Sequence, residues 1–458
     1  MYILFRLLSK EDFGIMATIS AAYFYLRAIC TFQIGEAIMH TDNIRQNRKK
    51  LSSAIWGLLI LSTIVYVLVI LFGSFYADIF SNNSIYFGLS KISLLLFFDV
   101  IYEVYRSILH KELQFDKLFT ISFLGKSVYF FSSILLAYLG FGYKALLYSF
   151  FLSAITESVL AYFYGRKMFT PILYFKWSLI RDVMRFGGYS SGSRFLRKIR
   201  DQFDTILIGR FFGMETLGVY NVFKSLLLRL VKILSPLVGN VTTPLLTREK
   251  SNFNHAKNIF YTQNKFYTLF TFPLFMGLLV FSKSVIGYYF GQEYLPNIFL
   301  FQLLTIAYLL SNTTALMNTL VVSHGEVKGS FYWNGLSLGC YVLVVYALFS
   351  KGVEAIAIGL IVFFVIKILF AFNFVIKQSI GGKASDFFMS FSMELFFALG
   401  TGIIFYLILF FFNPNILFEV ILMILYSIVV GSYFLYTNRQ IIKEIVSKKE
   451  PLDLEFPK

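Results

Sequence analysis

Positively charged side chains inside apolar segments are the residues of this chain that could do chemistry. Six of them exceed the acidic residues available to neutralise them, and they lie on three apolar segments, 13–35, 186–212 and 216–244. A guanidinium group binds phosphate through two parallel hydrogen bonds, so a cavity with a surplus of cations suits a polyanionic substrate. The expected substrate-binding residues are Arg27, Arg194, Arg197, Lys224, Arg229 and Lys232.

The segment 186–212 cannot face lipid. It carries six charges between residues 194 and 204. Each charge costs about 2.5–3.5 kcal/mol at the centre of an inserted helix, so the set costs on the order of 15 kcal/mol unless it meets water or protein. This segment is therefore expected to line a cavity or the protein interior.

Part of this charge has a purely structural interpretation. A spacing of four residues on a helix predicts the ion pairs Arg197–Asp201 and Arg200–Asp204. A third structural pair, Lys126–Glu157, is expected because both residues fall about 10–12 Å from the same membrane surface. Isolated charges in other spans are expected to be structural or interfacial; they are Lys265, Lys367 and Glu394.

Other kinds of site find little support in the sequence. Cys30 and Cys340 are distant and lie in apolar runs, so they predict neither a disulfide framework nor a metal site. The four histidines are scattered, and no glycine-rich phosphate loop or Ser/His/Asp order stands out; the histidines are His40, His110, His255 and His324. We therefore expect no catalytic residues, no metal, no cofactor and no nucleic-acid partner.

The composition is that of a polytopic membrane protein. Of 458 residues, 57% are hydrophobic and only 14% are charged, whereas soluble domains are roughly a quarter charged. We expect an all-α fold with thirteen transmembrane helices, since a span needs about 20 apolar residues. The expected spans are 13–35, 54–77, 85–106, 118–139, 143–164, 186–212, 216–244, 258–282, 296–322, 329–349, 353–376, 388–412 and 416–437.

The distribution of lysine and arginine between loops predicts the orientation. Alternate loops beginning after the first span, together with the C-terminal tail, hold 23 of these residues, and the opposite loops hold six. Basic loops stay in the cytoplasm, so the C-terminus is expected there. Thirteen spans ending inside must begin outside, and a further helix of about 20–25 residues before Met1 would remove this oddity.

An internal repeat gives a second reason to expect that helix. The segment 8–16 resembles 212–220 at an offset of 204. Farther on, Gly125, Gly142 and Ala145 match Gly335, Gly352 and Ala355 at an offset of 210. Parallel repeats predict two six-helix lobes with a substrate site between them. The expected parts are an N-terminal lobe (1–164), a cytoplasmic loop (165–185), a C-terminal lobe (186–380), an extra helix pair (381–437) and a basic tail (438–458).

Three stretches resemble the Wzx-type polysaccharide flippases of the multidrug/oligosaccharidyl-lipid/polysaccharide (MOP) superfamily. They are Arg6–Gly14 (RLLSKEDFG), Leu109–Phe115 (LHKELQF), and Arg185–Gly188 continuing through Asp204–Gly213 to Leu217–Asn221. Lys10 stands where the family often has proline. The resemblance also implies a first helix that would precede Met1.

The resemblance implies a flippase of the bacterial inner membrane. It would move undecaprenyl-diphosphate-linked oligosaccharides from the inner to the outer leaflet by alternating access of its two lobes, driven by the membrane potential, H⁺ or Na⁺. The implied partners are this substrate, membrane lipids and other polysaccharide assembly proteins. One alternative is a drug or metabolite exporter of the MATE type, although its cationic substrates favour an acidic cavity. Another is a membrane-embedded glycan polymerase or acyltransferase, which would need a large outer loop or an embedded His/Asp pair.

Overall fold

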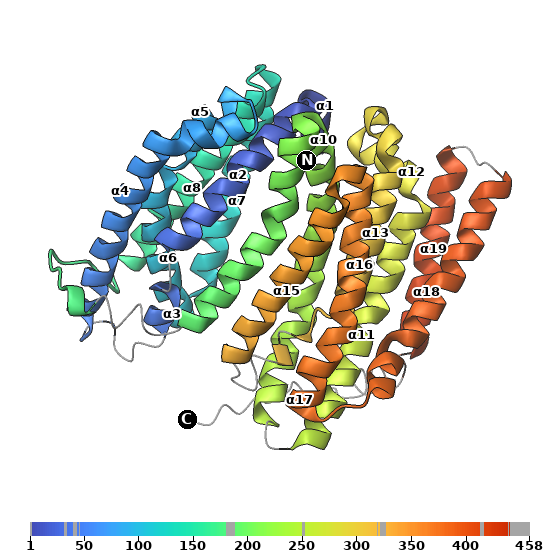
Figure 1. Ribbon diagram of the computed structural model, residues 1–458. Helices are drawn as coiled ribbons and strands as arrows, with labels where there is room; N and C mark the ends of the chain where they lie inside the picture. The colour runs from blue at the N-terminus through green and yellow to red at the C-terminus, as the bar shows by residue number, and fades with distance from the viewer. Residues whose placement is uncertain are drawn as a thin grey trace. The chain divides into compact units, whose positions relative to one another are not determined.

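The regular elements that the structure describes are all helical (Figure 1). A computed structural model describes the residues 2–31, 34–39, 44, 46–179, 188–249, 252–317, 319, 320, 327–412, 416–437 and 439. The all-α fold predicted from composition is therefore confirmed.

The helices follow one another with short connections. The first part of the chain forms α1 (Tyr2–Leu7), α2 (Lys10–Cys30), α3 (Ile34–Met39), α4 (Arg48–Ile79), α5 (Asn83–Ile92), α6 (Leu95–Lys111), α7 (Phe115–Tyr138) and α8 (Tyr143–Gly165). The 61-residue α10 (Gly188–Arg248) comes next. Then follow α11 (Phe253–Val280), α12 (Ser282–Val285), η1 (Ile286–Phe290), η2 (Gln292–Asn297), α13 (Ile298–Asn312), α15 (Val327–Leu348), η3 (Phe349–Lys351), α16 (Val353–Ala371), η4 (Phe372–Ile376), α17 (Lys377–Ile380), α18 (Ala384–Phe412) and α19 (Ile416–Thr437).

Ten helical segments of the described chain are long and apolar enough to cross a membrane, and the bent pair of α11 with α12–η1 raises the number to eleven. The 61-residue α10 is not among these segments. Each of the thirteen predicted segments contains a described helix, but the exact number of spans stays a prediction.

α10 differs from its expected form. The sequence predicts two spans separated by a loop near residues 213–215, whereas the structure continues the helix through this point and bends it at Gly213. Gly213 has φ +83°, which glycine adopts without the steric penalty of a Cβ atom. A single glycine thus replaces the expected loop.

The helices group into two compact units. The first comprises residues 1–226, 289–300 and 325–363, and the second comprises 227–288, 301–324 and 364–458. In the first unit α8 packs along both α6 and α7, and α2 packs on α5. In the second unit α11 packs along α18, and Tyr426 of α19 donates a hydrogen bond of 2.7 Å to the Pro273 carbonyl of α11. The predicted division into lobes, loop, helix pair and tail stays a prediction.

The two copies of the 204-residue repeat meet inside the first unit. A Cβ atom on Gly14 of α2 would lie 1.9 Å from the carbonyl oxygen of Met214, and one on Gly218 of α10 would lie 1.8 Å from the carbonyl oxygen of Lys10. Both helices therefore touch backbone to backbone, with the repeated glycine of each facing the other. Lys10 adds an ion pair to Glu215 at 3.5 Å.

The second repeat also falls on equivalent local structure. Gly142 (φ +54°) directly precedes α8, and Gly352 (φ +111°) directly precedes α16. Both positions need a backbone conformation that favours glycine, which gives the matched glycines a physical reason.

Candidate functional site

A cavity of about 540 Å³ opens in the first unit among the C-terminal ends of α2 and α6, the short α3 and the first arm of α10. Among the residues that the structure describes, four cations, one acid and one histidine line this cavity. The charged and titratable lining residues are Arg27, Glu103, Arg106, His110, Arg194 and Lys198.

Arg27 is fixed on α2 by a buried acid of α6. Its Nε lies 3.2 Å from Oδ1 of Asp99, which also accepts a hydrogen bond from the Tyr23 hydroxyl one turn earlier on α2. The side chain of Asp99 is 6% exposed and that of Arg27 is 27% exposed. The acid therefore anchors the guanidinium from behind while the side chain still reaches the cavity.

α6 supplies a second cation on the same wall. Arg106 Nη1 lies 3.5 Å from Glu103 Oε1, and His110 follows one turn later on the same face of the helix. Gly35 of α3 allows this helix to come close, because a Cβ atom there would lie 3.0 Å from the Glu103 carboxylate and 3.1 Å from Ser107 Oγ.

The first arm of α10 supplies the opposite wall. Arg194 and Lys198 are four residues apart, so both point to one side of the helix and both line the cavity. The arm is positioned by a hydrogen bond of 3.2 Å from the Tyr25 hydroxyl of α2 to the Ile199 carbonyl. On its other side, Arg200 donates to Ser337 Oγ of α15 at 3.1 Å.

The arrangement can bind an anion that carries several negative charges. The described lining residues, with four formal cations and one acid, have a net charge of +3 when His110 is neutral. Arginine forks from two walls can hold phosphate oxygens bidentately, and Lys198 adds a compact point charge. Among the residues the structure describes, no group of three or more His, Cys, Asp or Glu side chains could hold a metal ion.

The structure brings together two of the six residues predicted to bind substrate. Arg27 and Arg194 line the cavity, and Arg197 does not, although it lies on the same arm and is partly buried. Arg229 and Lys232 belong to the second unit, where both side chains are exposed. Their roles stay predictions.

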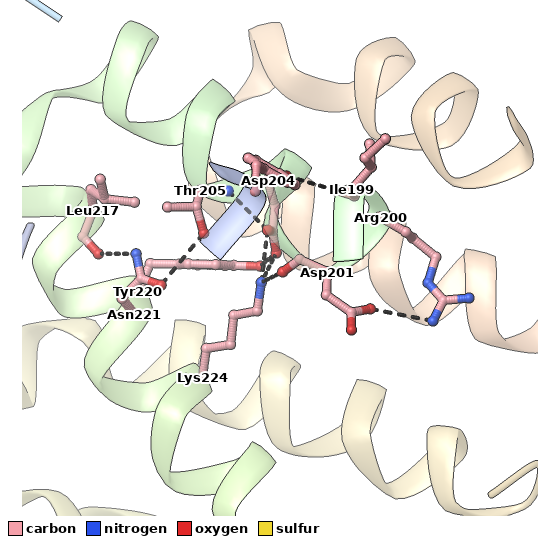
Figure 2. A network of polar contacts seen from close by, with 10 residues as sticks. Ile199, Arg200, Asp201, Asp204, Thr205, Leu217, Tyr220, Asn221 and Lys224 are labelled. Atoms are coloured by element: carbon pink, nitrogen blue, oxygen red, sulfur yellow. Dashed lines mark hydrogen bonds and ion pairs between the residues drawn. The ribbon is translucent and has the colours of Figure 1, made fainter. Parts of the chain in front are cut away.

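Lys224 is held in a separate buried network (Figure 2). Its Nζ donates to both carboxylate oxygens of Asp204 and to the Asp201 carbonyl, each at 2.7 Å. Tyr220, one turn earlier, donates a hydrogen bond of 2.5 Å to the same carboxylate. Because an ammonium group has three donors, this network uses all of them, and Lys224 has none left for a substrate.

The two ion pairs predicted on α10, Arg197–Asp201 and Arg200–Asp204, are wrong, because both aspartates pair with other residues. The bend at Gly213 brings the second arm against the first, so Lys224 takes Asp204 in place of Arg200. Asp201 instead pairs with Arg200 at 3.2 Å, in place of Arg197.

The third predicted pair is also not formed. The described residues include no N–O contact within 4.0 Å between Lys126 and Glu157, although Glu157 packs against the neighbouring Gly125. Equal depth on two helices does not bring the two side chains into register.

Three basic residues of the cavity, Arg106, His110 and Lys198, are not among those that the sequence predicts to bind substrate. The sequence marks Lys198 as a buried charge but not as a ligand, and it places Arg106 and His110 at the end of a span. Their spacing could have identified them, because Arg106/His110 and Arg194/Lys198 are both i, i+4 pairs and so share one face of a helix.

Comparison with solved structures defines the fold. Residues along 96% of this chain superpose on 97% of the lipid II flippase MurJ in its inward closed conformation, with a TM-score of 0.74 at 16% sequence identity. A multidrug resistance MATE family transporter of the MOP superfamily in an inward-facing conformation matches 81% of this chain and 94% of its own, with a TM-score of 0.60 at 17% identity. The chain therefore shares the fold of this flippase and this transporter.

The sequence then assigns the family. Residues 3–299 match the polysaccharide biosynthesis protein family, and the chain belongs to it. The teichuronic acid biosynthesis protein TuaB of Bacillus subtilis is 23% identical over 72% of this chain and 68% of its own length. The lipopolysaccharide biosynthesis protein WzxC of Escherichia coli is 20% identical over 89% of this chain and 82% of its own.

Proposed function

We propose that this protein is a flippase that moves undecaprenyl-diphosphate-linked oligosaccharides across the bacterial inner membrane for surface polysaccharide synthesis. The observation that carries the proposal is the cationic cavity in a chain of this family and fold. A diphosphate carries pairs of oxygens, and each pair can accept two parallel hydrogen bonds from one arginine of the cavity. The oligosaccharide and the polyprenyl tail would extend from it toward water and lipid.

The end of the molecule at which the cavity lies supports loading from the inner leaflet. The cavity is formed where α2 and α6 end and where α10 begins. The loops at these ends belong to the lysine- and arginine-rich set expected in the cytoplasm. A substrate made on the cytoplasmic side would meet the cavity directly, and alternating access would release it on the other side.

Export of cationic drugs is the rival with the same fold, and the cavity argues against it. Glu103 is the one acid among the described lining residues, and Arg106 lies beside it at 3.5 Å. A cationic drug would meet four like charges there, which disfavours binding.

The test is transport of a polyprenyl-diphosphate-linked oligosaccharide in vesicles that contain the purified protein. The wild-type protein should move a labelled substrate between leaflets, and inorganic diphosphate should compete for the cavity. Movement of a cationic dye in the same vesicles, with the lipid-linked oligosaccharide left in its original leaflet, would overturn the proposal in favour of an exporter.

A further inference from the structure

Glu394 of α18 is a buried carboxyl group in the second unit. The residue has an exposed fraction of 0%, and neither Oε1 nor Oε2 accepts a hydrogen bond from another residue that the structure describes. An ionised carboxylate in this setting has lost water without gaining donors, which is unfavourable. Ionisable groups inside a membrane protein that are kept at such a cost usually serve transport or proton relay.

The cation that faces Glu394 is held loosely. Lys265 Nζ of α11 lies 3.9 Å from Glu394 Oε1, which is longer than a hydrogen bond. The Lys265 side chain is 45% exposed, whereas the Glu394 side chain is 0% exposed. Lys265 can therefore turn toward solvent or headgroups, while Glu394 must stay inside.

A neighbouring amide offers an acceptor without a described donor. Asn264, fully buried on α11, donates through Nδ2 to Ser390 Oγ at 2.9 Å, one turn before Glu394, and its Oδ1 lacks a described partner. Tyr433 of α19 stacks on Phe397, one turn after Glu394 on α18, with the two ring centroids 3.6 Å apart. A protonated carboxyl adds a donor to this set, which a carboxylate cannot.

We propose that Glu394 is an intramembrane proton-binding site that exchanges between an ion pair with Lys265 and a neutral protonated carboxyl, and that this exchange couples proton movement to transport. The proton enters from water and binds one carboxylate oxygen as the ammonium group turns away. The titratable groups that face Glu394 are Lys265 from α11 and Tyr433 from α19, and Asp386 lies two turns earlier on α18. The coupling half of the proposal rests on the proposed function, and the proton-binding half does not.

Infrared difference spectroscopy of the purified protein between two pH values tests proton binding directly. The wild-type protein should show a carbonyl band of a protonated carboxyl at the lower pH, and Glu394→Gln should lack it. Glu419→Gln is the matched control, because Glu419 already has a partner in Ser284 Oγ at 2.5 Å. Identical difference spectra for wild type and Glu394→Gln would overturn the proposal, and so would a spectral change at Glu394 driven by Na⁺ at constant pH.

Transport in vesicles with an imposed pH gradient tests the coupling. The gradient should raise the wild-type rate of movement of a labelled polyprenyl-diphosphate-linked oligosaccharide, and in Glu394→Gln the ratio of rates with and without the gradient should fall to one. A thermal unfolding profile equal to that of the wild type shows that the variant is folded. A gradient response retained in Glu394→Gln would overturn the coupling. If the wild-type protein moved no substrate at all, the proposed function and the coupling would both fall, and the infrared band would still decide proton binding.

Discussion

Two buried clusters of this protein contain similar residue types but have different roles. In each, a tyrosine and a cation stand one turn apart on a helix and share an aspartate of a neighbouring segment: Tyr23, Arg27 and Asp99 in one, and Tyr220, Lys224 and Asp204 in the other. Arg27 gives one nitrogen to its acid and still lines the cavity, whereas Lys224 spends every donor inside the network. The number of donors on the cation separates a binding residue from a structural one.

The Lys224 network should matter for stability. Lys224→Met leaves Asp204, which is 0% exposed, as an unpaired buried charge, so we expect a loss of about 3–5 kcal/mol in the free energy of unfolding. Adding Asp204→Asn should recover much of that loss. Thermal unfolding in detergent measures both effects, and Lys232→Met serves as an exposed lysine on the same helix. Equal destabilisation by the single and double variants would contradict the ion-pair explanation.

Arg194 should matter for substrate binding. Arg194→Ala removes from the cavity wall both the positive charge and the paired donors of the guanidinium group. Arg194→Lys keeps the charge but not the paired donors, so we expect it to retain transport only in part. The measurement is display of surface polysaccharide in a strain that depends on this protein, with membrane abundance measured alongside. Lys351→Ala, far along the chain in an exposed turn, is the control. Normal display by Arg194→Ala at normal abundance would count against the cavity as the binding site.

The sequence identifies charged spans but not the partners within them. Arg27 and Arg194 can be found because charge surplus and depth can be read from a linear sequence. Asp99 and Lys198 escape detection as site residues because the contact between α2, α6 and α10 depends on packing between distant segments.

At the scale of elements, the crossing of α2 and α10 is the clearest product of the internal repeat. Gly14 and Gly218 occupy equivalent positions of the two copies, and a Cβ atom on either would lie less than 2 Å from a carbonyl oxygen of the other helix. The repeat can be recognised from sequence, but the contact between its copies cannot, since self-similarity carries no information on which copies touch.

Alanine at either glycine should force these helices apart. We expect Gly14→Ala and Gly218→Ala each to cost about 1–3 kcal/mol or more, because a backbone carbonyl cannot move aside as a side chain can. Gly400→Ala on α18 is the control, since a Cβ atom there would meet nothing within 4 Å. Thermal unfolding of the three variants gives the comparison, and a Gly14→Ala protein as stable as Gly400→Ala would show that the crossing is looser than described.

At the scale of the whole molecule, loop charge remains the basis for orientation. The sequence predicts a helical multi-pass protein correctly because hydrophobic length is a local property. It predicts a loop at Gly213 where a bent helix runs, because glycine permits both outcomes and only packing of the two arms selects one.

Cysteine labelling in a variant without Cys30 and Cys340 should establish the orientation. Arg48→Cys and Lys176→Cys should react with an impermeant reagent only from the cytoplasm, and Glu215→Cys and Lys351→Cys only from outside. All four side chains are suited to this because Lys176, Lys351 and Glu215 are exposed and Arg48 lies at the start of α4. Reversed labelling at residues 176 and 351 would reject the charge-based topology.

The glycine crossing also has a mechanical consequence. Arg27 is 13 residues beyond Gly14 along α2, which is about 20 Å at 1.5 Å per residue. Because the two backbones touch at this crossing, a rotation of α2 about it would displace most the part of the helix farthest from Gly14. Tilting that part of the helix by about 10° would carry Arg27 roughly 3.5 Å sideways, more than the length of about 2.9 Å of a hydrogen bond between an arginine nitrogen and a phosphate oxygen. A small rotation of α2 at the crossing would thus be enough to break a hydrogen bond between Arg27 and a phosphate oxygen.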